Sequence, residues 1–162
     1  MERAADTDSI GRVVEAAFQN APYSSHTEQC IVNTLRRCNQ LTISMVAEYG
    51  DAIVGHVAIS PVTVSSGAQG WYGLGPLAVL PSHQRQGIGS MLTRAALTEL
   101  RRCGGAGCVV LGDPGYYGRF GFKAHPGLQL PGVPPEYFQA LAFGSGPPVG
   151  TVRYREAFDT TV

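Results

Sequence analysis

The sequence lacks a surplus of charge of either sign, and it lacks any long run of apolar residues. Lys and Arg together number 12, as do Asp and Glu, so the formal net charge is zero. A chain without a basic excess has no electrostatic field that would attract nucleic acid. No apolar stretch approaches the length of a membrane span, and residues 1–6 contain no apolar signal-peptide core. We therefore expect a cytoplasmic protein with neither a nucleic-acid nor a membrane partner.

Paired cysteines and metal-ligand spacings are also missing. Cys30, Cys38, Cys103 and Cys108 form no C-x-x-C pair and have no histidine at zinc-finger spacing. We expect reduced cysteines that partly fill the core, and no metal site. The 162 residues are 44% hydrophobic and contain no internal repeat or dividing linker, so residues 1–162 are predicted to form a single domain.

A glycine-rich turn between a strand and a helix is the most informative feature that is present. Residues 79–92 run from the end of an apolar strand through Pro81 and a polar turn into a helical apolar pattern. Backbone N–H groups of such a turn, with the first N–H groups of the helix, point to one place and favour a phosphate chain. Gly87 and Gly89 let the ligand approach the backbone closely. Gln84, Arg85 and Gln86 add further donors to the same turn.

A dinucleotide-binding fingerprint is the competing interpretation of this turn. That fingerprint requires G-x-G-x-x-G directly after a strand, but Gly87 and Gly89 are followed by Leu92 where the third glycine should be. A second match, Gly73 to Ala78, lies inside the expected strand and contains a proline. The pattern Q-x-x-G-x-G over 84–89 instead resembles the acyl-CoA pyrophosphate loop of the GNAT superfamily of N-acetyltransferases.

A second motif lies downstream at a consistent distance. Val109, Val110 and Leu111 form a short apolar run typical of a buried strand, and residues 115–120 are expected to form a short helical turn. Asp113 precedes Pro114, which is typical of a helix cap, although a role in a proton relay is an alternative. Tyr116 and Tyr117 then precede Gly121-Phe122 with the spacing of an aromatic pair followed by x-x-x-G-F.

Together the two motifs resemble the GNAT superfamily of N-acetyltransferases. The agreement in order and spacing extends from Trp71 to Phe122. The wording D-P-x-Y-Y-x-R-F-G-F and the tail from Pro131 to Tyr154 are similar to the YhbS-type subgroup. The resemblance implies a GNAT-like acyl-CoA N-acyltransferase fold, with acetyl-CoA as acyl donor and no metal. It implies direct transfer to a primary amine of a small molecule or peptide in a ternary complex.

The resemblance also implies roles for individual residues. Tyr117 matches the position of a tyrosine hydroxyl near the thioester sulfur and is the expected general acid. The strand before the turn would offer backbone groups at Leu77 and Val79, and Pro76 marks an expected bulge that frees them. The expected donor-binding residues are Leu77, Ala78, Val79, Gln84, Arg85, Gln86, Gly87, Ile88, Gly89, Ser90, Tyr116 and Phe120.

Several alternatives stay open at this point. The strand from Trp71 to Leu77 has no acidic residue that could serve as a base. Deprotonation of the amine would use a water relay, Glu48, His56 or Asp113. A non-catalytic acyl-CoA sensor or interaction domain, or a transferase for another acyl group, is the alternative function. The oligomeric state is also open, with a homodimer as one alternative.

Apolar periodicity predicts the elements around the motifs. One helix should begin near a cap at Asp6 or Thr7, and a second at a capping box of Ser25 and Glu28. Alternating apolar and polar residues over 41–45 predict a first strand, a turn follows at 49–51, and further strands are expected over 53–64 and 71–79 with a loop over 65–70. The helix after the phosphate turn should bury one stripe, formed by Ile88, Met91, Leu92, Ala95 and Ala96, and should end at Arg102 before Gly104.

The C-terminal part is less regular. Residues 127–148 are rich in Gly and Pro and are expected to form a long loop with one helical turn over 136–141. Val152, Tyr154 and Phe158 should lie in a terminal strand. The order of elements predicts an α/β (α+β) fold, in which a mixed, mostly antiparallel central sheet has helices on both faces. The first strand of the superfamily would have to precede Asp6, and is either stunted or absent.

Overall fold

The central sheet has five strands in the order β1-β2-β4-β5-β7. The structure, a computed structural model, describes residues 1–159. The strands are β1 (Ile43–Tyr49), β2 (Ala52–Pro61), β4 (Trp71–Val79), β5 (Gly107–Leu111) and β7 (Phe138–Ala142). Only β4 and β5 are parallel; the other neighbours are antiparallel. The predicted mixed and mostly antiparallel sheet is therefore confirmed.

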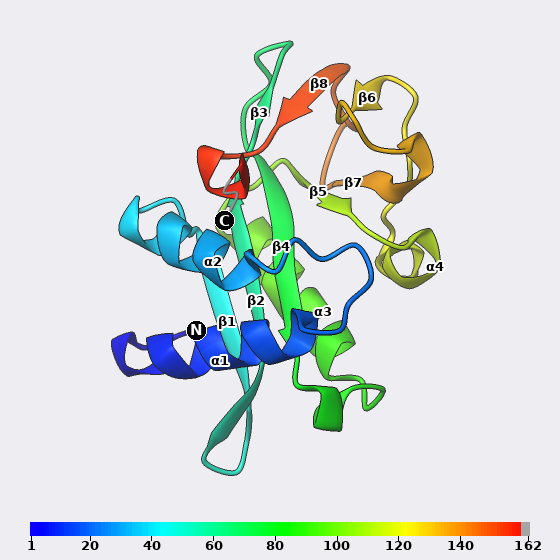
Figure 1. Cartoon of the computed structure of the whole chain (residues 1–162). Helices are drawn as coiled ribbons and strands as arrows, with labels where there is room; N and C mark the ends of the chain where they lie inside the picture. The colour runs from blue at the N-terminus through cyan, green and yellow to red at the C-terminus, as the bar shows by residue number, and fades with distance from the viewer. Residues whose placement is uncertain (160–162) are drawn as a thin grey trace.

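A smaller sheet joins the middle of the chain to its C-terminal part. It consists of β3 (Thr63–Val64), β8 (Gly150–Arg153) and β6 (Leu128–Gln129), with β8 in the middle. β3 and β8 are antiparallel, whereas β6 and β8 are parallel. Figure 1 shows this sheet beyond one end of β4. The predicted strand 53–64 is thus divided, since its last residues pair with β8 rather than with β4.

Helices cover both faces of the central sheet. Figure 1 shows α1 (Thr7–Phe18) and α2 (Glu28–Arg37) in front of it and α3 (Ile88–Arg102) behind it. α4 (Pro114–Tyr117) follows β5. Short 3-10 turns complete the chain: η1 (Ala4–Asp6), η2 (Pro81–His83), η3 (Gly118–Phe120), η4 (Pro135–Tyr137) and η5 (Glu156–Asp159).

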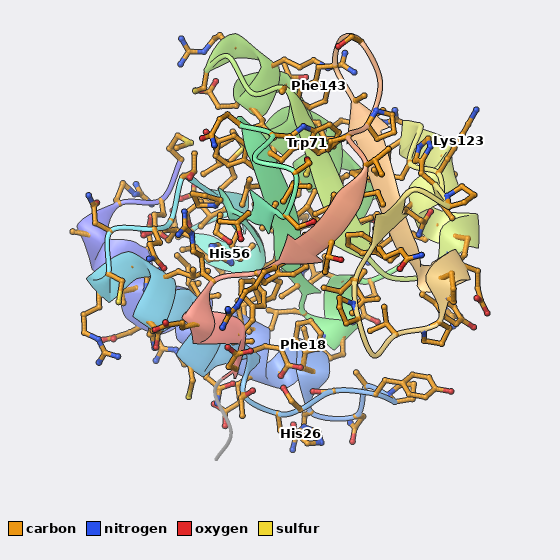
Figure 2. The ribbon with its side chains drawn as sticks, turned by 90° about the horizontal axis from the view of Figure 1, so that it is seen from above. Phe18, His26, His56, Trp71, Lys123 and Phe143 are labelled. Atoms are coloured by element: carbon orange, nitrogen blue, oxygen red, sulfur yellow. The ribbon has the colours of Figure 1, made fainter. Side chains whose placement is uncertain are left out.

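Each face of the sheet has its own hydrophobic core. On the α3 side, Leu92, Ala96 and Leu100 pack with Val57 and Val110. On the α1 side, the packed residues are Ile10, Val13, Val14, Val32 and Ala78. Figure 2 shows His56 in the interior and Lys123 pointing outward at the periphery. Because the two cores lie on opposite faces, the position of β4 between them is fixed from both sides.

The predicted buried stripe of α3 is only partly correct. Leu92 and Ala96 are buried, but Met91 is 57% exposed and Ala95 is also exposed. The helix is rotated so that the other buried residues are Thr93, Leu97 and Leu100. Thr93 tolerates burial because its hydroxyl donates to the carbonyl oxygen of Gly89, 2.8 Å away.

The helical turn predicted over 136–141 is wrong in its larger part. Only Pro135–Tyr137 forms a 3-10 turn, and β7 begins at Phe138. Its backbone pairs with β5 from Leu111↔Phe138 to Gly107↔Ala142. This long-range pairing satisfies the backbone groups of β5, which outweighs the local helical pattern. The terminal strand ends at Arg153, so Phe158 lies in η5 instead.

Of the predicted helix caps, the one at Asp113 is confirmed, whereas those before α1 and α2 differ from the prediction. Asp113 caps α4, because its carboxylate accepts from the Gly115 N–H at 3.0 Å. Asp6 is the residue before α1, but its carboxylate accepts from the Arg3 N–H at 2.7 Å instead of capping the helix. Glu28 accepts from the Ser25 N–H at 3.2 Å, as in a capping box, although Thr27 is the residue that precedes α2.

No strand precedes α1 within residues 1–159. The segment before η1 makes one ladder-like contact, in which the Glu2 N–H donates to the Ser44 carbonyl at 2.9 Å. Among residues 1–159, no helix combines the length and the hydropathy that are needed to cross a membrane.

Candidate active site

The site is built where β4 separates from β5. Their parallel pairing covers only Trp71–Gly73, after which β5 pairs with β7 alone. On the other side of β4, Leu74 pairs with Ile59 but Leu77 with Val57, so β4 carries one extra residue in this interval. The expected bulge at Pro76 is therefore present. The segment that follows has no β5 neighbour, and its backbone can face a ligand.

The phosphate turn follows β4 directly. After η2, Gly87 immediately precedes α3 with a φ of 81°, a conformation that favours glycine. The Met91 N–H donates to the Gly87 carbonyl, so the N–H groups of residues 88–90 precede the first internal bond of the helix. Such N–H groups with the helix dipole form an anion site. Gln84 anchors the turn, since its side-chain amide donates to the Val79 carbonyl at 3.0 Å.

A hollow of about 540 Å³ runs from this turn to Tyr116, and we call it the donor groove. Its lining residues are Leu77, Val79, His83, Gln84, Arg85, Gly87, Ile88, Gly89, Ser90, Tyr116 and Arg119. Nine of the residues predicted from the sequence are among them. The others, Ala78, Gln86 and Phe120, are not. Ala78 packs on the α1 side of the sheet, and Phe120 packs against the α3-side core.

Arg119 was not predicted as a site residue. It lies in η3, and its guanidinium carbon is 4.4 Å from the centroid of the Tyr116 ring. Its Nε donates to the Tyr116 carbonyl at 3.2 Å, which fixes the side chain beside the groove. With Arg85, it gives the groove two positive charges that suit a phosphate chain. The sequence does contain a signal for this residue, because Arg119 is a positively charged side chain that closely follows Tyr116 and Tyr117.

Gly89 keeps the donor groove open. A Cβ atom at this position would lie 2.8 Å from the Tyr116 hydroxyl and 3.9 Å from a Leu77 methyl group. Those distances place the missing side chain between the phosphate turn and the tyrosine. The glycine therefore leaves room there for a ligand.

The adjacent residues Tyr116 and Tyr117 line two different hollows. The rings of Tyr116 and Tyr117 meet edge to face, with centroids 4.9 Å apart, and Tyr117 also contacts Phe122. Tyr117 fits against Gly112, where a Cβ atom would collide with its ring. Tyr116 lines the donor groove, whereas Tyr117 lines the second hollow. Burial raises the pKa of the Tyr117 hydroxyl well above its ordinary value, so the hydroxyl stays protonated at neutral pH.

The second hollow is a cleft of about 680 Å³, and we call it the acceptor cleft. Residues from α1, α2, β4, the β5–α4 turn, β8 and η5 line it: Phe18, Glu28, Ile31, Leu74, Gly75, Pro76, Leu77, Leu111, Gly112, Tyr117, Leu130, Pro131, Thr151, Val152, Arg153, Tyr154, Phe158 and Asp159. Leu77 lines both hollows. The groove and the cleft therefore both border the bulged part of β4, one beside Tyr116 and the other beside Tyr117.

The three side chains considered as bases lie outside the acceptor cleft. Glu48 lies in β1, an edge strand of the central sheet, and pairs with Arg3 at 2.5 Å. Asp113 caps α4. His56 is fully buried between β1 and the N-terminal segment. None of the three lines the cleft.

His56 belongs to a buried polar network on the α1 side of the sheet. Ser44 donates its hydroxyl proton to Glu2, so the His56 Nε2–H must donate to the Ser44 oxygen, 2.7 Å away. Glu2 in turn pairs with Arg36 of α2 at 2.8 Å. Burial lowers the pKa of His56 to about 4; Glu2 opposes this shift and Arg36 adds to it. His56 is therefore neutral at pH 7 and acts as a structural group.

The shift of His56 predicts a loss of stability in acid. Between pH 6.5 and about 4, His56 binds a proton in the unfolded chain but stays neutral in the folded protein. The unfolded state then holds more protons, so the free energy of unfolding falls with pH, by at most about 3 kcal/mol. Denaturant titrations at several pH values should show this fall, and His56→Gln should flatten it. Equal pH slopes in His56→Gln and wild type would refute the assignment, with exposed His26→Gln as control.

Within residues 1–159, no group of three or more His, Cys, Asp or Glu side chains is arranged to hold a metal ion. All four cysteines are free thiols, and Cys108 is buried in the core.

Comparison with known proteins gives consistent results. The "Acetyltransferase (GNAT) family" model matches residues 11–122. The "Uncharacterized N-acetyltransferase YhbS" of Escherichia coli K12 is 38% identical over 116 residues, 70% of this chain and 70% of the relative. A crystal structure of a GNAT family acetyltransferase from Brucella melitensis, in complex with acetyl-CoA, has a TM-score of 0.88 and 49% identity, and the match covers 98% of this chain and 95% of that one. YhbS of Escherichia coli in complex with CoA has a TM-score of 0.83 and 32% identity, covering 98% and 89%. The resemblance drawn from the motifs is confirmed.

Proposed function

The chain belongs to the GNAT family of acetyltransferases, and on this basis we propose that it transfers the acetyl group of acetyl-CoA directly to a primary amine. The observation that carries the proposal is that Leu77, in the bulged part of β4, lines both the donor groove and the acceptor cleft. A thioester beside Leu77 would face an amine in the cleft, so no covalent enzyme intermediate is needed.

The donor groove would hold the CoA moiety. The N–H groups of residues 88–90, with Arg85 and Arg119, suit the pyrophosphate. The backbone of Leu77 and Val79, without a β5 neighbour, would bind the pantetheine chain and the acetyl carbonyl. Tyr116 lines the same groove. Ala78, Gln86 and Phe120 would act by shaping this region and not by contact.

The reaction must first overcome protonation of the amine. An alkylammonium of pKa near 10.4 is almost entirely charged at neutral pH, which costs roughly 4 kcal/mol. Once the proton has passed to water, the amine lone pair attacks the thioester carbon. The C–N bond forms and the C–S bond breaks, so that the CoA thiolate leaves with the electron pair. The nitrogen gives up its second proton as the intermediate breaks down, a proton is taken up by the CoA thiolate, and the transferred acetyl group ends as a neutral amide.

Tyr117 would serve the departing thiolate. Tyr117 lines the acceptor cleft together with Leu77, and its raised pKa keeps its hydroxyl in the protonated, donor form. The same shift makes complete proton transfer to sulfur unfavourable, because a thiol of pKa near 8.5 is the stronger acid. A hydrogen bond to the developing thiolate is therefore its main contribution.

The alternative function is an acyl-CoA sensor that binds the donor without turnover. CoA release from acetyl-CoA in the presence of a panel of primary amines separates the two functions. An N-acetylated amine formed in equal amount to the CoA released supports the enzyme. Tight acetyl-CoA binding with no release above the amine-free rate would support the sensor. The same assay with longer acyl-CoA donors tests for a different acyl group.

The remaining proposals concern the protein as a whole. We propose that residues 1–162 act as a single domain, since the acceptor cleft draws on elements from α1 to η5. The free thiols support a location in a reducing compartment such as the cytoplasm. A homodimer stays a prediction.

A further inference from the structure

The acceptor cleft is mostly apolar but contains two buried polar atoms without partners. Its walls are formed mainly by aliphatic and aromatic side chains, among them Phe18, Ile31, Leu77, Leu130 and Phe158. Glu28 and Tyr154 both line this cleft, and one oxygen of each, Glu28 Oε2 and the Tyr154 hydroxyl, is buried without a hydrogen-bond partner. Buried polar atoms are normally satisfied, so two exceptions in one cleft point to a missing ligand.

The two oxygens of Glu28 have different environments. Oε1 accepts from the Ser24 hydroxyl at 2.8 Å and from the Ser25 N–H at 3.2 Å, which hold the side chain at the start of α2. Oε2 has no donor. The residue is only 9% exposed, so water does little to solvate the carboxylate. An unsatisfied buried carboxylate oxygen is costly, and a cationic donor would remove that cost.

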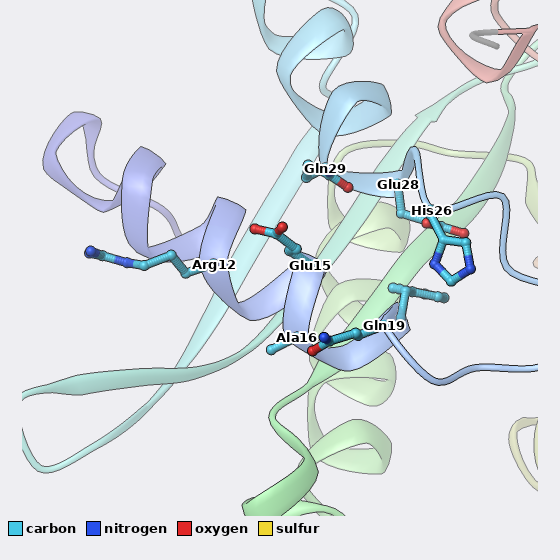
Figure 3. Close-up of a pocket in the computed structure, with 8 residues that line it drawn as sticks. Arg12, Glu15, Ala16, Gln19, His26, Glu28 and Gln29 are labelled. Atoms are coloured by element: carbon cyan, nitrogen blue, oxygen red, sulfur yellow. The ribbon is translucent and has the colours of Figure 1, made fainter. Parts of the chain in front are cut away.

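Glu28 is the one buried charge among the described residues that line the acceptor cleft. Asp159 and Arg153, the other charged residues there, are exposed. Glu28 also borders a smaller hollow of about 340 Å³ between α1 and the start of α2. Figure 3 shows it there beside His26, across from Glu15 and Gln19. That hollow contains neither Leu77 nor Tyr117, so an amine there would not meet the thioester.

We propose that Glu28 binds the ammonium group of the acceptor, and that the acceptor is a primary amine carried on an apolar body. The inference rests on the proposed function, because it places this amine in the cleft next to Leu77 and Tyr117. The apolar walls would bury the body of the amine, and the free Glu28 oxygen would accept from its N–H groups. Tyr154 lines the same cleft, and its unpartnered hydroxyl would bond to a polar atom of the acceptor.

Phenethylamine is a suitable probe, and the CoA-loaded protein allows its binding to be measured without turnover. Calorimetry first establishes that CoA binds, and phenethylamine is then titrated into the complex. Glu28→Gln keeps an acceptor toward Ser24 and Ser25 but replaces the free oxygen with an N–H donor. We expect this variant to bind phenethylamine about 10- to 100-fold more weakly, with unchanged CoA affinity. Glu15→Gln, which changes an acid outside the cleft, should bind like wild type.

The outcomes separate this inference from the proposed function. Failure of wild type to bind CoA would overturn the proposed function itself. CoA binding with equal phenethylamine affinity in wild type and Glu28→Gln would overturn the role of Glu28. Tighter binding of spermidine than of phenethylamine would overturn the apolar class of acceptor. If Glu28→Gln lowers the midpoint of thermal unfolding, Glu28→Asp, which keeps the charge but withdraws it, should still weaken amine binding while CoA affinity stays constant.

Discussion

Tyr117→Phe is expected to lower turnover with acetyl-CoA and an amine by about 10² to 10⁴, the usual range for a positioned acid. The substitution removes one hydroxyl and keeps the ring that packs against Phe122 and Gly112. Affinity for acetyl-CoA should therefore change little. If the hydroxyl only donates a hydrogen bond, the loss falls near the lower end of the range. Steady-state CoA release, with donor binding measured by calorimetry, separates the two effects.

Tyr116→Phe is the matched control, because Tyr116 lines the donor groove and not the acceptor cleft. Its turnover should fall much less. Because burial raises the pKa of Tyr117, the wild-type rate should show no limb from this residue as pH rises through the neutral range. If Tyr117→Phe turned over at the wild-type rate, Tyr117 would not be the donor to the CoA sulfur, and bound water would be favoured in that role.

Gly89→Val is expected to weaken CoA binding by about 100-fold or more while the protein stays folded. The new side chain would fill the space between the phosphate turn and the Tyr116 hydroxyl. The phosphates would then lose their close backbone contacts, and hydrogen bonds to a charged group are worth about 1.5–3 kcal/mol each. The helix dipole alone contributes at most about 2 kcal/mol. Titration calorimetry with CoA measures the change.

Gly11→Val provides the control, because a Cβ at this position of α1 meets no atom within 4 Å. It adds the same side chain to a helix without touching the donor groove. Its CoA affinity should match that of wild type. A folded Gly89→Val protein with the wild-type dissociation constant would remove the phosphate site from this turn.

Local chemistry explains why the structure around the proposed donor site could be predicted from the sequence. The phosphate turn, the tyrosine pair and the cap at Asp113 each depend on residues close together in the chain, and their spacing is fixed by backbone geometry. The bulge at Pro76 was predictable for the same reason, since proline cannot donate to a sheet ladder.

The acceptor side could not be predicted in this way, because it is assembled from distant segments. The sequence indicates only a capping role for Glu28. The fold shows in addition that Glu28 lines the cleft and that one of its carboxylate oxygens has no hydrogen-bond partner. Tyr154 was assigned to a strand face, yet it follows β8 and reaches the same cleft. β7 was missed for a related reason: its pairing with β5 is a long-range interaction that outweighs a local helical pattern.

A crystal structure of the protein with bound acetyl-CoA would test the central claim most directly. The account predicts the pyrophosphate on the N–H groups at the start of α3, the pantetheine chain along β4 from Val79 to Leu77, and the thioester sulfur within hydrogen-bond distance of the Tyr117 hydroxyl. The acetyl group should point into the acceptor cleft. Acetyl-CoA bound away from the phosphate turn, or a thioester out of reach of both Leu77 and Tyr117, would contradict it.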